Sequence, residues 1–340
     1  MDFRASRIAA LVALGLLATA ARAADVNLVA KPVPIPGGSG GVRIDDFYFD
    51  RLLGKLVLPA GRTGQLDFVD PESFVVEALG GFPVPKKSTG TPMGGLTSAD
   101  AGPGVVFATD RTDRKLYIID GAARSILGSS ALKAEPDYAR YVASEREVWV
   151  TEPSQRQIEV LSISAEGGAW SASHEAVIVS SAAFEALAVD GERGSAYSNQ
   201  DGDTLVIDLK SRQIVHRWPN GCKRARGLAL DGTRGFLVVA CDEGRAAVLD
   251  VAHDGKVLSA LQGPDGLDRI AFVPGLAHVY LAGGKPGRLM VAALRDDGQL
   301  EDLGVVTTSA GAKRVAGDDR RGIWVADGRK GRLLYLKDPY

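Results

Sequence analysis

Charged residues recur at one position of a repeated unit in this 340-residue chain, close to the start of a short apolar run. Carboxylates stand there at Asp45 and Glu185. Cations stand there at Arg226, Arg269 and Lys313. Arginine offers planar, paired donors to anionic groups, so a ring of such mixed charges suits an anionic or polyhydroxylated small molecule. With a neighbouring carboxylate included, the predicted ligand-binding residues are Asp45, Glu185, Arg226, Asp268, Arg269 and Lys313.

A network of mutually paired ions around a wet channel is the alternative interpretation of the same residues. Arg140 and Arg224 lie near these positions and would join either arrangement. The sequence leaves both interpretations open. It also leaves open whether the ligand is a small molecule or a periplasmic protein.

A second recurrent position follows the next apolar run, and most residues there carry side-chain oxygens. Oxygens that converge on one face can bind a hard cation such as calcium. Asp and Asn side chains also bond to their own backbone and start turns, which is the interpretation that we favour. The residues at this position are Asp110, Glu152, Asn199, Cys241 and Asp327.

The elements that must position these side chains are short β-strands, in a unit of roughly 40 residues that recurs along the chain. The fifth unit shows the pattern best, with the β-rich runs "GLALD", "FLVVAC", "AAVLD" and "KVLSALQG" separated by turns. Such runs, bounded by turn residues, specify antiparallel strands. The predicted units are residues 42–81, 95–134, 137–180, 184–221, 224–263, 266–307 and 312–340.

Four short strands in each of seven units predict an all-β, seven-bladed β-propeller with four-stranded antiparallel blades. The last unit ends too soon for a fourth strand, and the strand-like residues 25–35 precede the first complete unit. We therefore expect this N-terminal strand to close the ring, which would remove an exposed sheet edge. Six or eight blades would require the units at 42–81 or 137–180 to be divided differently.

Residues 1–23 differ from the rest of the chain. Arg4 and Arg7 precede an apolar run from Ile8 to Ala21, and small residues suited to a cleavage site follow. We expect a signal peptide that is cut after Ala23, and hence a periplasmic or secreted bacterial protein. A membrane anchor is the weaker alternative, because a spanning helix needs roughly 20 apolar residues. We expect no membrane span after cleavage.

The predicted mature chain, residues 24–340, is a single propeller domain that we expect to be a monomer. Without the signal it carries 37 basic and 41 acidic side chains, and this weak, mixed charge argues against a nucleic-acid partner. Its two cysteines flank a hairpin of the fifth unit, so both would return to the same face. We therefore predict a disulfide between Cys222 and Cys241.

The runs "VWVTEP", "IEVLSI", "AYSN", "TLVIDL" and "VYLAGG" resemble the YVTN repeats of the YncE-like bacterial periplasmic β-propellers. The resemblance covers nearly the whole mature chain. It implies a binding or interaction protein without a cofactor. This fold also houses cytochrome d1-like and quinoprotein-like domains. The histidines His174, His216, His253 and His278 fall in predicted outer strands or turns, where none suits an axial ligand of a channel haem.

Catalysis has no clear signature in this sequence. It contains no nucleophile elbow, phosphate-binding glycine loop or paired-cysteine zinc motif, so the catalytic residues stay unknown and enzyme activity stays uncertain. The alternative function is that of a metal-dependent lactonase similar to the gluconolactonase group. Such an enzyme would need a divalent cation. Its candidate ligands are Glu185, Asn199 and Asp268, although that group's flanking motifs are absent.

Overall fold

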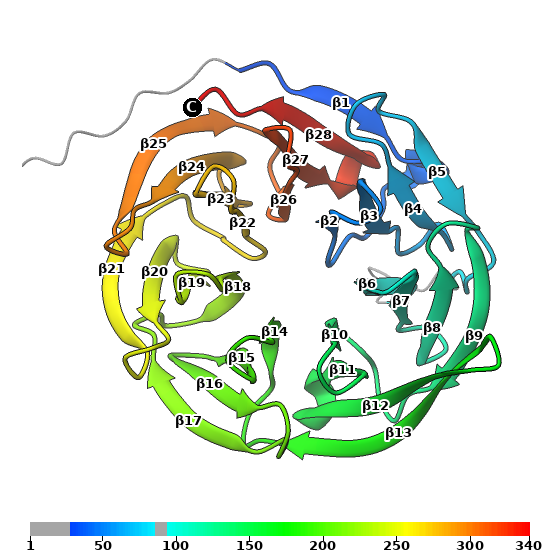
Figure 1. The fold of residues 1–340 in the computed structure, drawn as a ribbon. Coiled ribbons are helices and arrows are strands. Elements are labelled where there is room, and N and C mark those ends of the chain that lie inside the picture. The colour runs from blue at the N-terminus through cyan, green and yellow to red at the C-terminus, as the bar shows by residue number, and fades with distance from the viewer. Residues whose placement is uncertain (1–27, 86–93) are drawn as a thin grey trace, which may run out of the picture.

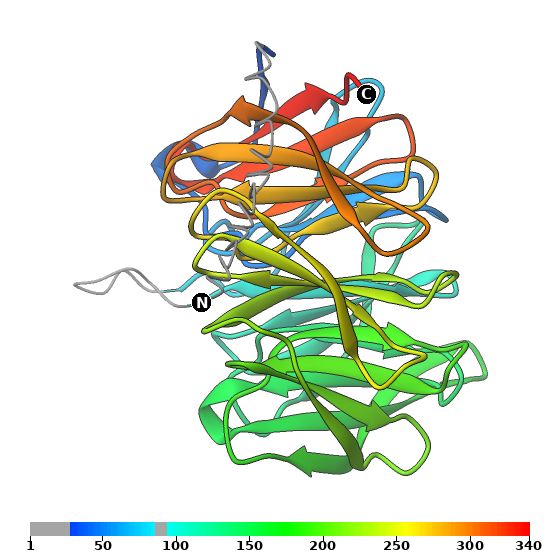
Figure 2. The same cartoon turned by 90° about the vertical axis from the view of Figure 1, so that its left-hand side faces the viewer.

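Seven four-stranded antiparallel sheets form a ring around a central axis in the computed structural model, which describes residues 28–85 and 94–340 (Figure 1). The predicted seven-bladed propeller is therefore confirmed. The predicted signal peptide, 1–23, and the first residues of the predicted closing strand lie outside the described residues. Figure 2 shows the ring edge-on. No helix among the described residues is long and apolar enough to cross a membrane.

The first four blades follow each other along the chain. Blade 1 contains β2 (Tyr48–Asp50), β3 (Lys55–Pro59), β4 (Leu66–Val69) and β5 (Val76–Leu79). Blade 2 contains β6 (Leu96–Gly102), β7 (Val105–Asp110), β8 (Lys115–Asp120) and β9 (Ser125–Ala131). Blade 3 contains β10 (Ala139–Val142), β11 (Glu147–Glu152), β12 (Gln157–Glu166) and β13 (Ala169–Val179). Blade 4 contains β14 (Glu185–Asp190), β15 (Ser195–Gln200), β16 (Asp203–Asp208) and β17 (Ile214–Pro219).

The last three blades complete the ring. Blade 5 contains β18 (Ala225–Asp231), β19 (Phe236–Cys241), β20 (Arg245–Asp250) and β21 (Lys256–Gln262). Blade 6 contains β22 (Ala271–Val273), β23 (His278–Gly283), β24 (Arg288–Leu294) and β25 (Leu300–Thr307). Blade 7 contains β26 (Val315–Gly317), β27 (Gly322–Asp327), β28 (Arg332–Lys337) and β1 (Lys31–Pro34). Three single-turn 3-10 helices are described: η1 (Gly38–Gly40), η2 (Pro153–Gln155) and η3 (Gly328–Lys330).

The burial of each strand follows its place in the blade. In β7, β11, β19, β23 and β27, the second strand of each of these blades, every residue is buried. These strands are covered on both faces by neighbouring blades, and this explains the apolar runs within their sequences. The outer strands, such as β9 and β21, are exposed at most positions. The turn in "EVWVTEPSQRQIEVLSI" is η2, which connects the second and third strands of blade 3.

The N-terminal strand closes the ring, as predicted. β1 pairs antiparallel with β28, with Val33 opposite Leu333, and Figure 1 shows the two strands side by side. Val33 is 3% exposed and packs in the apolar cluster between blades 7 and 1. The segment after β1 is fastened as well, because the Ile35 amide donates to the Gly331 carbonyl over 3.0 Å. Gly331 has a φ of 60°, and a Cβ there would lie 1.8 Å from the Gly38 carbonyl oxygen, so only glycine fits.

The predicted disulfide is present and lies within blade 5. Cys222 and Cys241 are joined, with a Cα–Cα distance of 5.3 Å. Cys222 lies in the loop before β18, and Cys241 is the last residue of β19. The bridge therefore holds the start of the innermost strand of this blade against the end of its neighbour.

Asp67 is a carboxyl group in an unusual position within blade 1. It lies on β4, opposite Leu58 and Ala78, and it is fully buried. Neither of its carboxyl oxygens has a hydrogen-bond partner among the described residues. Burial without a compensating donor disfavours the ionised form and raises the pKa of Asp67 to about 7.

Closure of the ring can be tested at Val33. We expect Val33→Asp to lower the free energy of unfolding by about 3 kcal/mol, because it buries a carboxylate without a partner in the seam. Pro32→Asp is the matched control, since Pro32 is exposed on the same strand. It should change stability by less than about 0.5 kcal/mol. Equal effects of the two variants in chemical denaturation would contradict the importance of the seam.

The buried Asp67 predicts a dependence of stability on pH. Between about pH 4 and pH 7 the folded chain retains a proton on Asp67 that the unfolded chain releases, so the free energy of unfolding should fall as the pH rises. Asp67→Asn should flatten this slope and stabilise the protein at neutral pH by roughly 1 to 3 kcal/mol.

Asp70→Asn is the control for Asp67→Asn. Hydrogen bonds from the Ser73 backbone and from Lys55 lower the pKa of Asp70, so its contribution to stability is lost as the pH falls, which is the opposite sign. The contribution of Asp70 is lost below about pH 4, so Asp70→Asn should leave the slope between about pH 4 and pH 7 unchanged. Denaturation curves measured across this pH range test both variants. A slope in Asp67→Asn as steep as that of the parent would refute the assignment.

Candidate functional site

The innermost strands converge on the channel, and the residues before or at their first positions surround a cavity of about 200 Å³ at one mouth. We call it the mouth cavity. Its walls carry four carboxylates, four cations and one tyrosine. These residues are Arg43, Asp45, Asp137, Tyr138, Glu185, Arg226, Asp268, Lys313 and Arg314.

Five of the six predicted ligand-binding residues line this cavity. Arg269 does not line it, although it follows Asp268 directly in the chain. Its guanidinium lies deeper in the channel and contacts Asp46. Arg224, which we expected nearby, pairs with Asp242 and is mostly exposed. Arg140 also lies deeper in the channel and pairs with Asp46.

Opposite charges in the mouth cavity are paired across neighbouring blades. Arg226 Nη1 lies 2.8 Å from Glu185 Oε1, which joins blades 5 and 4. Lys313 Nζ lies 2.7 Å from Asp268 Oδ2. The side chains of Arg226, Glu185 and Lys313 retain exposed fractions of 32%, 34% and 42%. The cavity therefore combines an ion-pair network with charged groups that a solute can reach.

Several residues of the cavity were not predicted from the sequence. Arg314 contacts Asp45 over 3.1 Å and Asp268 over 3.2 Å, so it connects blades 1 and 6 from blade 7. Arg111, from the loop after β7, does not line the cavity but contacts the lining residue Asp137 over 2.8 Å. Asp137 is the first residue of the third predicted repeat unit, so its position in the repeat could have identified it from the sequence. Arg111 belongs to a turn and has no equivalent position in the pattern.

The carboxylates of the cavity differ in their proton affinity. Burial raises the pKa of Asp137 to about 6, although Arg111 opposes the shift. Burial also acts to raise the pKa of Asp268, but Arg314 and Lys313 outweigh it and hold the pKa below its usual value. Asp268 therefore stays ionised at neutral pH, while Asp137 changes charge in a mildly acidic medium.

A second layer of charges crosses the channel below the mouth cavity. Asp46 is buried, and its carboxylate lies 2.9 Å from Arg140 Nη1 and 2.6 Å from Arg269 Nε. The Ser98 hydroxyl donates to it over 2.6 Å. Burial acts to raise the pKa of Asp46, and the two guanidinium groups overcome this and lower it. We call Asp46, Ser98, Arg140 and Arg269 the Asp46 cluster. It joins blades 1, 2, 3 and 6.

The oxygen-bearing residues at the ends of the second strands support adjacent loops. Asp110 Oδ1 accepts the backbone amide of Thr112 over 2.7 Å. Glu152 Oε1 accepts the backbone amide of Ala134 over 2.7 Å. The Asp110 contact matches the turn interpretation, whereas the Glu152 contact joins residues 18 positions apart.

The three candidate lactonase ligands do not share one site. Glu185 and Asp268 line the mouth cavity. Asn199 is fully buried, its Oδ1 accepts the Thr204 hydroxyl, and its Nδ2 donates to the Arg226 carbonyl. The side-chain amide of Asn199 therefore forms hydrogen bonds both within blade 4 and with blade 5. Among the described residues, the one close group of three Cys, His, Asp or Glu side chains is Cys222, Cys241 and Glu243, and two of these form the disulfide.

Comparisons with known proteins identify the fold. No family model matches the chain, and no curated protein sequence matches it. One similar solved structure is a chain of the mitotic checkpoint complex, with a TM-score of 0.72, 12% identity, and coverage of 99% of this chain and 98% of that chain. Another is the Cps50 (Swd1) β-propeller domain of Myceliophteria thermophila, with a TM-score of 0.68, 12% identity, and coverage of 87% and 97%. Both are WD40-type seven-bladed β-propellers. At this identity the likeness shows the fold alone.

The Asp46 cluster predicts a structural role for Asp46. Asp46→Asn should lower the free energy of unfolding by about 3 kcal/mol, because two largely buried guanidinium groups lose their shared carboxylate. Asp319→Asn is the control, since Asp319 pairs with Arg51 at the surface with 46% exposure. That variant should cost less than about 1 kcal/mol. If denaturation curves of the two variants coincide, the cluster does not stabilise the channel.

Proposed function

We propose that this protein is a secreted, non-enzymatic binding module whose mouth cavity receives a polar ligand. The ligand is an anionic or polyhydroxylated small molecule, or a charged segment of a partner protein. One observation carries the proposal: Glu185, Arg226 and Lys313 stand at the open end of the channel, and they are paired but still accessible. An incoming carboxylate or hydroxyl can replace one partner of such a pair without leaving a charge buried and unpaired.

The arrangement of donors and acceptors supports a ligand that bears both kinds of group. Arg226 and Lys313 offer N–H donors, and Glu185 and Asp268 offer acceptors directly beside them in the same cavity. Arginine donors suit carboxylate groups, and carboxylate acceptors suit hydroxyl groups. A sugar acid has both groups within one small molecule, so it is the first probe to test.

A protein partner is supported by the fold. The similar solved structures include a chain of the mitotic checkpoint complex, which is a protein assembly. The propeller fold is consistent with an interaction module. A partner would place an acidic or polar side chain in the mouth cavity and cover the rim around it.

The cellular location is proposed from the sequence. The signal-like residues 1–23 and the repeats that resemble YVTN units support a bacterial periplasmic protein of the YncE-like family. The disulfide is compatible with an oxidising compartment. We propose that the mature protein begins after Ala23 and acts as a monomer.

Binding at the mouth cavity can be tested by calorimetry with D-glucuronate as the small-molecule probe. The double variant Arg226→Gln/Lys313→Gln should bind at least about tenfold more weakly than the parent, because the two most exposed of the four cations in the cavity wall are removed. Arg295→Gln is the control, since Arg295 pairs with Glu301 at the exposed outer surface. It should bind as the parent does.

A protein partner is tested in parallel by capture from a cell-envelope extract with the immobilised parent and double variant. Proteins retained by the parent and lost by the variant support the partner form of the proposal. Thermal melts establish that the variants are folded. The proposal fails if neither glucuronate nor any protein distinguishes the parent from the double variant.

A further inference from the structure

A second cavity, of about 230 Å³, lies in the same channel and involves different residues. Four apolar side chains in its wall follow the mouth residues of the same blades by two positions each. Leu187 follows Glu185, Leu228 follows Arg226, Ile270 follows Asp268, and Val315 follows Lys313. Two residues of an extended strand span about 6 to 7 Å. The second cavity therefore lies one layer further along the axis, and we call it the inner cavity.

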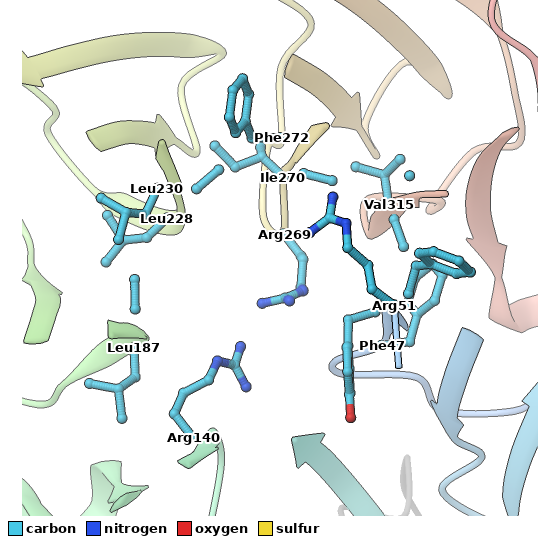
Figure 3. A pocket seen from close by; sticks show the side chains of 17 residues that line it. Phe47, Arg51, Arg140, Leu187, Leu228, Leu230, Arg269, Ile270, Phe272 and Val315 are labelled. Atoms are coloured by element: carbon cyan, nitrogen blue, oxygen red, sulfur yellow. The ribbon is translucent and has the colours of Figure 1, made fainter. Parts of the chain in front are cut away.

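The inner cavity combines apolar side chains with guanidinium groups. Leu187, Leu228, Leu230, Ile270, Phe272 and Val315 form its apolar wall. In Figure 3 the guanidinium groups of Arg140 and Arg269 extend from different blades toward the middle of this space. Arg51 stands at its edge and pairs with Asp319. An apolar wall that faces guanidinium groups is the surface that an amphiphilic anion requires.

Arg269 is the guanidinium with unused hydrogen-bonding capacity. Its Nε contacts Asp46, and its two terminal nitrogens donate no hydrogen bond to any described residue. Arg140 is more fully engaged, because its Nη1 donates to Asp46, Ser98 and the Ala139 carbonyl. The half-buried Asp100 also acts on Arg140 electrostatically. The terminal nitrogens of Arg269 are thus the donors available for an anionic group.

The cavity volume limits the size of the ligand. A volume of about 230 Å³ corresponds to roughly eight groups the size of a water molecule, at about 30 Å³ each. A carboxylate with a short hydrocarbon chain has this size, whereas a dinucleotide or a folded segment does not.

We propose that the inner cavity binds a small amphiphilic carboxylate, whose head accepts hydrogen bonds from the terminal nitrogens of Arg269 and whose hydrocarbon body packs on Leu187, Leu228, Leu230 and Ile270. Burial of the hydrocarbon chain supplies the attraction, and the planar guanidinium fixes the orientation. The proposal is independent of the function proposed for the mouth cavity, because the two cavities share no lining residue.

Titration calorimetry with octanoate tests this proposal, with acetate and 1-octanol as the matched ligands that lack the chain or the charge. Octanoate should bind the parent protein at least tenfold more tightly than either. Arg269→Gln should weaken octanoate binding at least tenfold and leave 1-octanol binding nearly unchanged. Arg295→Gln, at the outer surface, should bind octanoate as the parent does.

A second variant keeps the test decisive if Arg269→Gln proves unstable through its contact with Asp46. Leu230 is partly exposed and lines the cavity, so Leu230→Glu places a negative charge in the apolar wall without touching the Asp46 cluster. It should also weaken octanoate binding at least tenfold. The proposal is overturned if octanoate does not bind, if acetate binds as tightly as octanoate, or if the folded variants bind octanoate as the parent does.

Discussion

Pairing between β1 and β28 is the constraint on which the ring depends. Each blade buries its apolar faces against two neighbours, so blades 1 and 7 cannot complete their shared core until the ring closes. The seam at Val33 and Leu333 is the joint that unites segments from the two ends of the chain. Both cavities depend on it indirectly, because blade 7 supplies Lys313 and Arg314 to one and Val315 to the other.

The channel contains two cavities with different linings, one of them charged and the other partly apolar. The Asp46 cluster joins four blades through one buried carboxylate and separates a polar mouth from a partly apolar interior. This carboxylate orients two guanidinium groups, and one of them keeps free donors. An interaction that stabilises the ring thus also positions the side chain that we propose as a ligand anchor.

The fold could be predicted from the sequence because its determinants are local. Runs of four to seven apolar or β-branched residues between turns specify the strands, and the short last unit indicated the closing strand. The site was predicted only in part. Asp45 and Lys313 could be placed by their position in the repeat, but the deeper position of the Arg269 guanidinium depends on its contact with the buried Asp46 of another blade. Arg111 comes from a loop, where the path of the side chain depends on contacts between blades.

The position of the closing strand determines when blade 7 can be completed during synthesis of the chain. β1 is among the first segments to leave the ribosome, and its partner β28 is synthesised about 300 residues later. At roughly 5 to 20 residues per second, the delay is about 15 to 60 seconds. Throughout this interval Val33, the one residue of β1 that is buried in the folded ring, has no partner strand. Blade 7 therefore stays incomplete until β28 is available, whatever the order in which the other blades form.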